Sequence, residues 1–333
     1  MRGHIAATLI LLVILSAISN VGSGLKGIVV AASIEPLAAI ASEICGAMGD
    51  VLVLVPEGVE PHAFQLTPDV IKIAESADLI VHTGHMSWEF KLVNVTGKPS
   101  VGLDEYLAYG LNLSYIPGTG DLNLHGYWLK VENSIAIARA IAHKLAEIDP
   151  GNAEFYMDNL KHFENKVKAL KSFIESTVES YGIRGVKVVV TFPAEAYVAE
   201  SFSLEPVASI VKGPNLFISG SELYRVSEML KNGSVKLILL SKLSQKMKAV
   251  EYAYQLSRDT GVKIAYVRTI SIQGLNDYFG LVTYNLGSIV SALSSSSSNT
   301  SSINEVYYLV TIVLLTLISV VELIIIFRLK VMI

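Results

Sequence analysis

Histidines are the residues with the clearest capacity for chemistry in this 333-residue sequence, which contains seven of them. Neutral imidazole binds zinc and other transition metals, so a histidine held in a rigid loop is a candidate metal ligand. His62 follows an apolar run at residues 51–55 and lies between Pro61 and Pro68. At the carboxyl end of a strand, such a loop would direct the imidazole into a cleft. The alternative is a surface histidine without a ligand role.

Two further stretches place histidine next to glycine. His125 precedes Gly126, which would allow a sharp turn, and Trp128, which would form a wall of the site. A histidine hydrogen-bonded near a helix start would explain the same pattern. His82 and His85 follow another apolar run and flank a glycine, and either could enter the same cleft. A period of two places His82 and Gly84 on one strand face and His85 beyond it, and His85 is the one we include as a candidate ligand.

Glu195 is the acidic candidate, early in a helix expected after Phe192 and a proline. A carboxylate at this place also interacts favourably with the helix dipole, which would explain it without a metal. The sequence contains no G-x-S-x-G, Walker A, H-E-x-x-H or C-x-x-C motif. We therefore expect a binding protein and not an enzyme.

Elements that could position these residues follow from the alternation of short apolar runs with amphipathic stretches, which predicts parallel α/β units. The second half of the chain repeats the rhythm of the first, so we expect two α/β lobes. The expected strands cover residues 27–33, 51–55, 79–82, 186–191, 235–240 and 263–267, and the expected helices cover residues 36–48, 68–76, 194–202 and 246–260.

A long helix is expected between the lobes, over residues 149–182. It begins at Asp149 and Pro150, and Gly182 ends it. At about 30 residues it would be roughly 45 Å long. A rigid spine between the lobes and a coiled-coil dimer helix are the two interpretations, and we favour the spine. Its apolar residues recur at steps of three and four: Tyr156, Leu160, Phe163, Val167, Leu170, Ile174, Thr177 and Tyr181.

The ends of the chain predict export followed by anchoring. Residues 1–24 resemble a secretory signal, with a retained signal anchor as the alternative. Residues 306–327 are apolar for long enough to span a membrane, and the basic tail at 328–333 places that end in the cytoplasm. A serine-rich linker at 294–305 would join this anchor to an extracellular, monomeric body. The net charge of −4, without a basic stripe, gives no case for nucleic acid.

Several stretches together resemble the zinc/manganese-binding receptor family of ABC importers, a periplasmic-type solute-binding family. The similarity extends over about residues 27–293. The matching stretches are residues 32–37 (Ala-Ser-Ile-Glu-Pro-Leu), 59–68 (Val-Glu-Pro-His-Ala-Phe-Gln-Leu-Thr-Pro), 77–80 (Ala-Asp-Leu-Ile) leading to Gly84, 128–129 (Trp-Leu) with Glu132 and Asn133, Asp149 with Pro150, and 284–286 (Tyr-Asn-Leu).

The resemblance implies an N-terminal lobe at 25–148, the spine helix at 149–182 and a C-terminal lobe at 183–293, with one metal ion in the cleft. Two histidines of the first lobe would meet a histidine or glutamate and a carboxylate of the second. His62 matches the first of these, and His125 matches the second although it stands one residue farther from the tryptophan than the family pattern places it.

The second lobe departs from the family pattern. Phe192 falls where the third ligand belongs and Arg268 near the fourth, and neither side chain binds a cation. Glu195 and Asp277 are the candidate substitutes.

Three functions remain open at this stage. The first is capture of a divalent metal, zinc before manganese, for delivery to a membrane permease, with an affinity that falls below about pH 6.5 as imidazole is protonated. The second is the same scaffold with a degenerate metal site, binding an organic or anionic ligand or acting as an adhesion or accessory module. The third and weakest is a membrane-anchored hydrolase using a metal-bound water.

Overall fold

The computed structural model describes residues 27–213, 216–241, 248–275 and 277–294. The expected signal at 1–24, the membrane span at 306–327, the tail at 328–333 and the linker beyond Ser294 lie outside these residues. Within the described ranges, every helix is too short or too polar to cross a membrane.

The first lobe is built on a four-stranded parallel sheet in the order β2-β1-β3-β4. Strand β1, one of its two central strands, is apolar and almost wholly buried, as is usual for a parallel sheet covered on both faces. The strands are β1 (Ile28–Ala32), β2 (Gly49–Val53), β3 (Leu79–Val81) and β4 (Ser100–Val101). The helices are α2 (Glu35–Cys45), α3 (Pro68–Ser76), α4 (Ser87–Thr96), α5 (Leu103–Ala108) and α6 (Val131–Ile148), with 3-10 turns η1 (Gly46–Met48), η2 (Pro61–Ala63) and η3 (Tyr127–Leu129).

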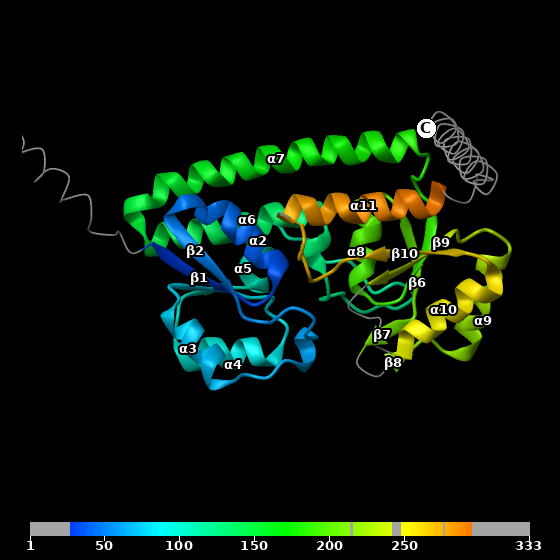
Figure 1. Cartoon of the computed structure of the whole chain (residues 1–333), viewed down its shortest axis with the longest axis horizontal. Coiled ribbons are helices and arrows are strands. Elements are labelled where there is room, and N and C mark those ends of the chain that lie inside the picture. The colour runs from blue at the N-terminus through cyan, green and yellow to red at the C-terminus, as the bar shows by residue number, and fades with distance from the viewer. Residues whose placement is uncertain (1–26, 214–215, 242–247, 276, 295–333) are drawn as a thin grey trace, which may run out of the picture.

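The second lobe repeats this plan with a parallel sheet in the order β10-β9-β5-β6. A short antiparallel pair, β7 with β8, accompanies this sheet and lies at the lower left of the second lobe in Figure 1. The strands are β5 (Lys187–Val190), β6 (Glu205–Ser209), β7 (Val211–Gly213), β8 (Leu216–Phe217), β9 (Leu237–Ser241) and β10 (Lys263–Val267), and the helices are α8 (Ala194–Ser201), α9 (Gly220–Lys231), α10 (Lys248–Thr260) and α11 (Tyr278–Ser294). The predicted α/β class with parallel sheets is confirmed.

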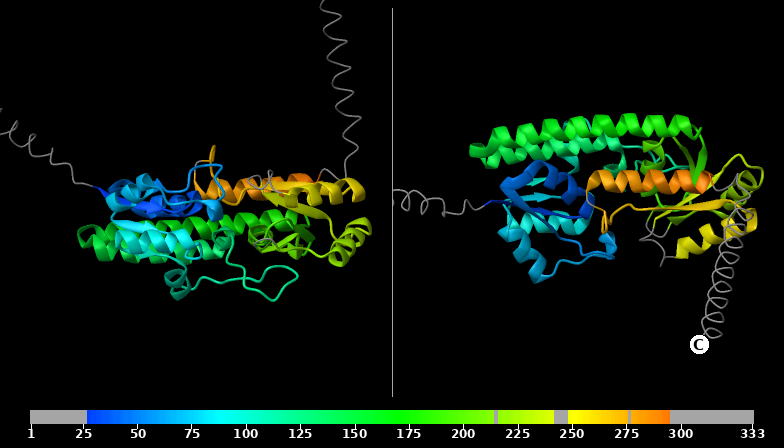
Figure 2. Two further views of the ribbon diagram at one scale, coloured as in Figure 1. Left: turned by 90° about the horizontal axis from the view of Figure 1, so that it is seen from below. Right: turned by 45° about the horizontal axis from the view of Figure 1, so that its top comes forward.

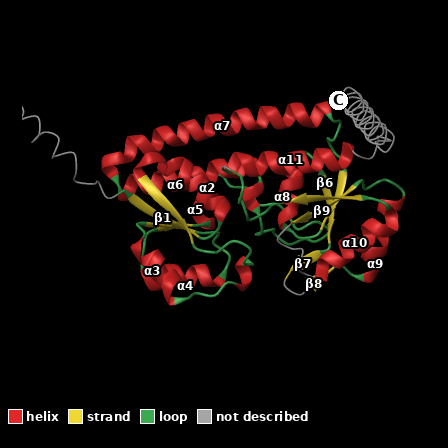
Figure 3. Ribbon diagram, viewed as in Figure 1, coloured by secondary structure: helices red, strands yellow, loops and turns green. Residues whose placement is uncertain are grey.

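The long helix α7 (Ala153–Ser180) has 28 residues and follows the 3-10 turn η4 (Pro150–Asn152). Figure 1 shows it running along one side of the molecule over both sheets, with α6 and α11 beneath it. Its buried stripe matches the predicted one through Ile174, but then passes to Val178, so Tyr181 is exposed. The chain leaves the helix through Gly182, whose φ of +60° an L side chain rarely adopts. The views in Figures 2 and 3 agree that α7 bridges the two lobes.

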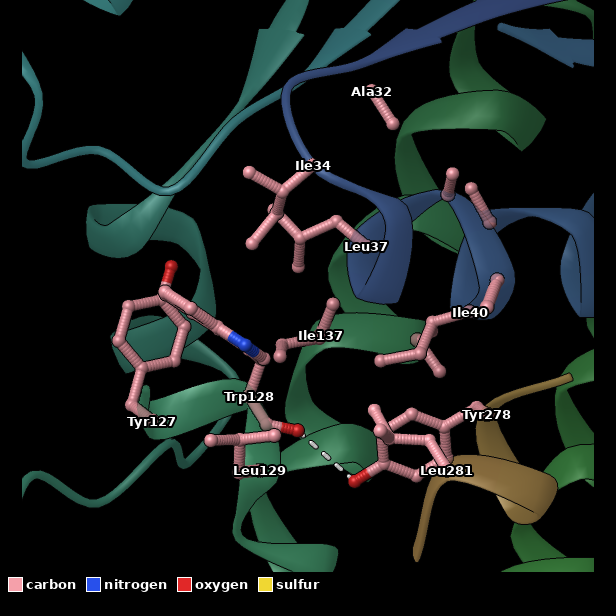
Figure 4. Close-up of a cluster of buried hydrophobic side chains, with 14 of the residues drawn as sticks. Ala32, Ile34, Leu37, Ile40, Tyr127, Trp128, Leu129, Ile137, Tyr278 and Leu281 are labelled. Atoms are coloured by element: carbon pink, nitrogen blue, oxygen red, sulfur yellow. Dashed lines mark hydrogen bonds between the residues drawn. The ribbon is translucent and has the colours of Figure 1, made fainter. Parts of the chain in front are cut away.

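Hydrogen bonds as well as packing join the lobes. The indole N–H of Trp128 donates to the carbonyl of Thr269 (2.9 Å), and the Tyr278 hydroxyl donates to the Trp128 carbonyl (3.0 Å). Figure 4 shows the second of these bonds within a cluster of buried apolar side chains that includes Ile34 and Leu129. The backbone N–H of Ile272 donates to the Glu35 carboxylate. One hydrophobic core therefore continues across the boundary between the two lobes.

Candidate metal centre

Three of the predicted histidines converge at the cleft between the lobes. The ring centroids of His62 and His85 are 5.2 Å apart, those of His62 and His125 are 5.0 Å apart, and those of His85 and His125 are 5.2 Å apart. One potential ligand atom from each residue lies within 4.8 Å of the other two. Modest side-chain adjustment would close such a group around one ion. Across the described ranges, no other trio of histidine, cysteine or acidic side chains is grouped this closely.

His62 is carried by the 3-10 turn η2, which begins at Pro61. The Glu60 side chain caps this turn by accepting the Ala63 N–H (2.8 Å). The indole N–H of Trp88 donates to the Pro61 carbonyl (2.9 Å), so the turn is tied to helix α4. The loop that carries His62 is therefore fixed by two hydrogen bonds, one from its own backbone to Glu60 and one from Trp88 to its backbone.

His85 lies in the tight turn between β3 and α4. Gly84 precedes it with a φ of +70°, and a Cβ there would lie 2.6 Å from the Leu103 nitrogen, so a larger residue would not fit. The buried Glu89 carboxylate fixes the turn. It accepts the Thr83 N–H (2.8 Å), the Thr83 hydroxyl (2.7 Å), the Gly84 N–H (3.0 Å) and the Met86 N–H (3.3 Å).

Glu89 was not identified from the sequence, although a signal for it was present. An acidic residue at the third position of a helix commonly caps the helix start, and the glycine and histidine just before α4 mark the turn to be capped. Burial of this carboxylate (1% exposed) makes the turn a rigid part of the core.

His125 is positioned by contacts with the second lobe. Its backbone N–H donates to Asn123 Oδ1 (3.1 Å), and Asn123 Nδ2 donates to the Pro193 carbonyl (2.8 Å). The Tyr197 hydroxyl donates to the Asn123 carbonyl (2.6 Å). Gly126, with a φ of +88°, packs so closely on Ala194 that a Cβ would come within 2.7 Å. This histidine thus belongs to the first lobe but is held by the second.

Trp128 forms a wall of the cluster, as its position next to the His-Gly pair predicted. Its ring stacks on that of His85 with an interplanar angle of 19° and centroids 6.3 Å apart. The neighbouring Tyr127 hydroxyl donates to the Thr83 carbonyl (2.8 Å), which links this wall to the His85 turn.

Burial keeps two of the imidazoles neutral. Burial, and then the nearby His62, lower the pKa of His85 to about 4. Burial, and then His85 and His62, lower the pKa of His125 to about 4. Both ring nitrogens of His85 are buried without a hydrogen-bond partner. Buried polar atoms are normally satisfied, so this ring fits a ligand role better than a structural one.

His82 lies outside the cluster. Its ring is buried against Gly102, and its nearest aromatic neighbour is Phe90, with centroids 6.2 Å apart. Of the two histidines that could have entered the cleft, His82 is therefore buried in the core and His85 lines the cleft.

Glu195 lies outside the cluster too, which departs from the prediction. It is fully buried, and its carboxylate accepts the backbone N–H groups of Thr191 (2.6 Å), Phe192 (3.1 Å) and Ser241 (2.5 Å). Burial raises its pKa to about 8, although the three N–H donors favour the charged form. Glu195 ties the ends of β5 and β9 together, so its oxygens are committed to the backbone.

The two other second-lobe residues of interest also serve local structure. Asp277 Oδ1 accepts the Gly280 N–H (2.8 Å) at the start of α11, and Asp277 is absent from the cluster. Arg268 turns away from the cleft: its guanidinium donates to the Gln273 carbonyl and lies over the Tyr284 ring, 4.8 Å from its centroid. Phe192 does line the cleft.

The cleft continues beyond the histidines into a cavity of about 550 Å³. The first lobe contributes the three histidines and Trp128, whereas the second lobe contributes a mostly apolar wall. The described lining residues are Ile34, Glu60, Pro61, His62, His85, Met86, His125, Gly126, Trp128, Phe192, Pro193, Ala194, Val211, Gly213, Phe217, Ser241, Ala249, Thr269 and Ile270.

Comparison with known proteins shows the same fold and identifies the family. The manganese ABC transporter substrate-binding lipoprotein PsaA of Streptococcus mitis is 28% identical over 307 residues, which cover 86% of this chain and 96% of PsaA. The AdcAII protein of Streptococcus pneumoniae superimposes with a TM-score of 0.66 at 25% identity, covering 80% of this chain and 99% of AdcAII. Nickel-bound FpvC of Pseudomonas aeruginosa, at 24% identity and a TM-score of 0.66, covers 82% of this chain and 99% of its own and shows the same fold. Residues 30–292 match the model of the zinc-uptake complex component A, periplasmic (ZnuA) family, and the chain therefore belongs to that family.

Proposed function

We propose that this chain is the substrate-binding receptor of a metal ABC importer and that its cargo is a divalent transition metal held by His62, His85 and His125. Membership of the family makes the chain a solute-binding receptor and not an enzyme. The observation that carries the metal proposal is the convergence of the three imidazoles, each with a ligand atom within 4.8 Å of the others. A membrane permease is the partner that would accept the metal.

Zinc is the cargo we favour, with manganese second. The donor atoms of the described cluster are nitrogens only, and imidazole suits zinc, whereas manganese is better served by carboxylate and water oxygens. Several relatives, PsaA among them, are named as manganese proteins, which keeps manganese as the second candidate. Glu195 and Asp277 would join a metal only if they left the backbone groups that they now accept.

Zinc titration of purified protein against three alanine variants tests the proposal. His62→Ala and His125→Ala each remove one donor and should lower the zinc affinity sharply. His162→Ala is the matched control, because His162 is an exposed histidine on α7, far from the cluster in the sequence. Binding that survives His62→Ala and His125→Ala unchanged would show that the metal is held elsewhere.

Attachment to the membrane is a second part of the proposal. The relatives are named lipoproteins, but Cys45, the chain's only cysteine, is buried at the end of α2. Cys45 also lies far beyond the signal at residues 1–24, so it is poorly placed to carry a lipid. We therefore assign export to the signal at 1–24 and anchoring to the apolar span at 306–327, with the linker at 294–305 between the span and the body.

Membrane fractionation separates these possibilities. The full chain should remain with the membrane after an alkaline wash, and a chain ending at residue 293 should be released into solution. Retention of the shortened chain would contradict the C-terminal anchor.

A further inference from the structure

Three neutral imidazoles leave the charge of a bound metal uncompensated. A divalent ion held by His62, His85 and His125 would keep its full charge at a site where His85 and His125 are half-buried, and charges removed from water are normally paired. Family receptors with a carboxylate ligand would neutralise part of this charge. Here, Glu60 is the one acidic residue among the described residues that line the cleft, and its Oε2 already caps the His62 turn (2.8 Å to the Ala63 nitrogen).

The coordination sphere is also incomplete. Zinc takes four ligands in a tetrahedral arrangement, so three histidines leave one position open. Glu60 does not belong to the group of mutually close ligand atoms, and Glu195 is committed to three backbone N–H groups. Within the described part of the chain, no carboxylate lies close enough to the three imidazoles to be the fourth ligand without moving.

The pocket that contains the open position is much larger than a metal ion and one water require. The cavity measures about 550 Å³, whereas a water molecule occupies about 30 Å³ in the liquid. Pockets of about 300–1,000 Å³ with apolar walls and a few polar groups are typical of small organic ligands.

The far wall of the cavity is apolar. Phe192, Val211, Phe217 and Ile270 of the second lobe line it. The hydroxyls of Ser241 and Thr269, which also line it, lie 3.0 Å apart and hydrogen-bond to each other. This wall would favour an apolar surface over bulk water.

We propose that the site binds its metal together with a small organic carboxylate that has an apolar body. The carboxylate is the fourth ligand and neutralises part of the metal's charge, and the apolar body packs against Phe192 and Phe217. This inference rests on the proposed metal-receptor function and specifies the form in which the metal is carried.

Zinc titration of the full chain in the presence of benzoate or acetate tests this inference. Both anions offer one carboxylate and bind zinc weakly in solution, but only benzoate has a body that can fill the cavity. At equal millimolar concentrations, benzoate should tighten zinc binding by about tenfold or more and acetate by much less. By linkage, zinc should tighten benzoate binding by the same factor.

Two variants locate the effect. Phe217→Ala removes part of the apolar wall, so the tightening of zinc binding by benzoate, measured against the variant's own zinc affinity in plain buffer, should shrink. Tyr224→Ala is the control, because Tyr224 is an exposed aromatic residue (67%) that does not line the cleft.

The outcomes distinguish this inference from the function on which it rests. Zinc binding that depends on the histidines but is equal in buffer, acetate and benzoate would overturn the co-ligand and leave the metal receptor standing. No zinc binding under any of these conditions would overturn both. Zinc binding that appears only with benzoate would support both.

Discussion

Replacement of Glu89 by alanine should weaken the metal centre although Glu89 touches no metal ligand side chain. Its carboxylate accepts four hydrogen bonds from Thr83, Gly84 and Met86, and these residues form the turn that carries His85. Thr83 and Met86 are buried (0% and 3% exposed), so their N–H groups would lose an acceptor that water replaces poorly. An unsatisfied buried donor costs about 1–3 kcal/mol, so two such donors give a loss of roughly 2–6 kcal/mol, and relaxation of the turn shifts it toward the lower end.

The effect on zinc follows from the loosened turn. Groups that orient a metal ligand typically change affinity by about 10- to 100-fold when they are removed, and we expect Glu89→Ala to fall in this range. Urea denaturation of the metal-free protein measures the first quantity, and competitive zinc titration measures the second.

Glu222→Ala is the matched control. Glu222 is also the third residue of a helix and caps it by accepting the Ser219 N–H (3.0 Å), but it belongs to α9, is only half-buried and also pairs with Lys212 (2.6 Å). Its loss should leave zinc affinity unchanged. If Glu89→Ala and Glu222→Ala proved equally stable and equally able to bind zinc, our account of the His85 turn would be refuted.

Three further predictions concern the ligands and their loops. His85→Ala should reduce zinc affinity by more than the roughly 10- to 100-fold typical of an orienting residue, and an unchanged titration would remove His85 from the site. Because the pKa values of His85 and His125 are lowered to about 4, these two imidazoles should take up protons only below about pH 5, which NMR titration of their ring protons in the metal-free protein between pH 7 and 4 can test; a midpoint near pH 6.5 for either ring would contradict these lowered values. The same shifts mean that the unfolded chain binds more protons below about pH 6.5, so the metal-free protein should lose stability in urea as the pH falls from there toward 4. Gly126→Ala should displace His125 and lower zinc affinity, because the new Cβ would lie 2.7 Å from Ala194. Gly182→Ala is the control: Gly182 also has a positive φ, but no atom lies within 4 Å of the added Cβ, so this variant should affect stability alone.

The α/β plan was predictable because each strand is a short apolar run bounded by turn residues. The spine helix was predictable through Ile174, because Tyr156, Phe163 and Val167 keep one helical stripe. The prediction failed at Tyr181, which is exposed because the helix ends before its side chain can reach the core. The expectations about the chain's ends lie outside the described residues and stay predictions.

The candidate ligands differ in how local their sequence signals are. His62, His85 and His125 each follow a strand or a tight turn, so position in the sequence already suggested the cleft. Glu195 resembled a ligand equally well, because an acidic residue at a helix start serves either a metal or the backbone, and only the folded structure shows that it accepts N–H groups from both β5 and β9 loops.

The size and character of the cavity could not be predicted from sequence. Its apolar wall is formed by Phe192, Val211, Phe217 and Ile270. These residues belong to different segments of the second lobe that lie far apart in the sequence. No local pattern specifies which apolar side chains will face a cleft instead of a core. The expected pH dependence also changed for this reason, because burial of His85 and His125 was unknown until the lobes were seen together.

Anomalous diffraction at the zinc edge from crystals of the zinc-loaded protein tests the central claim most directly. Our account predicts one strong peak in the cleft, about 2.0–2.1 Å from one ring nitrogen each of His62, His85 and His125. A peak held by Glu195 or Asp277, or no peak among the three histidines at full zinc loading, would contradict it.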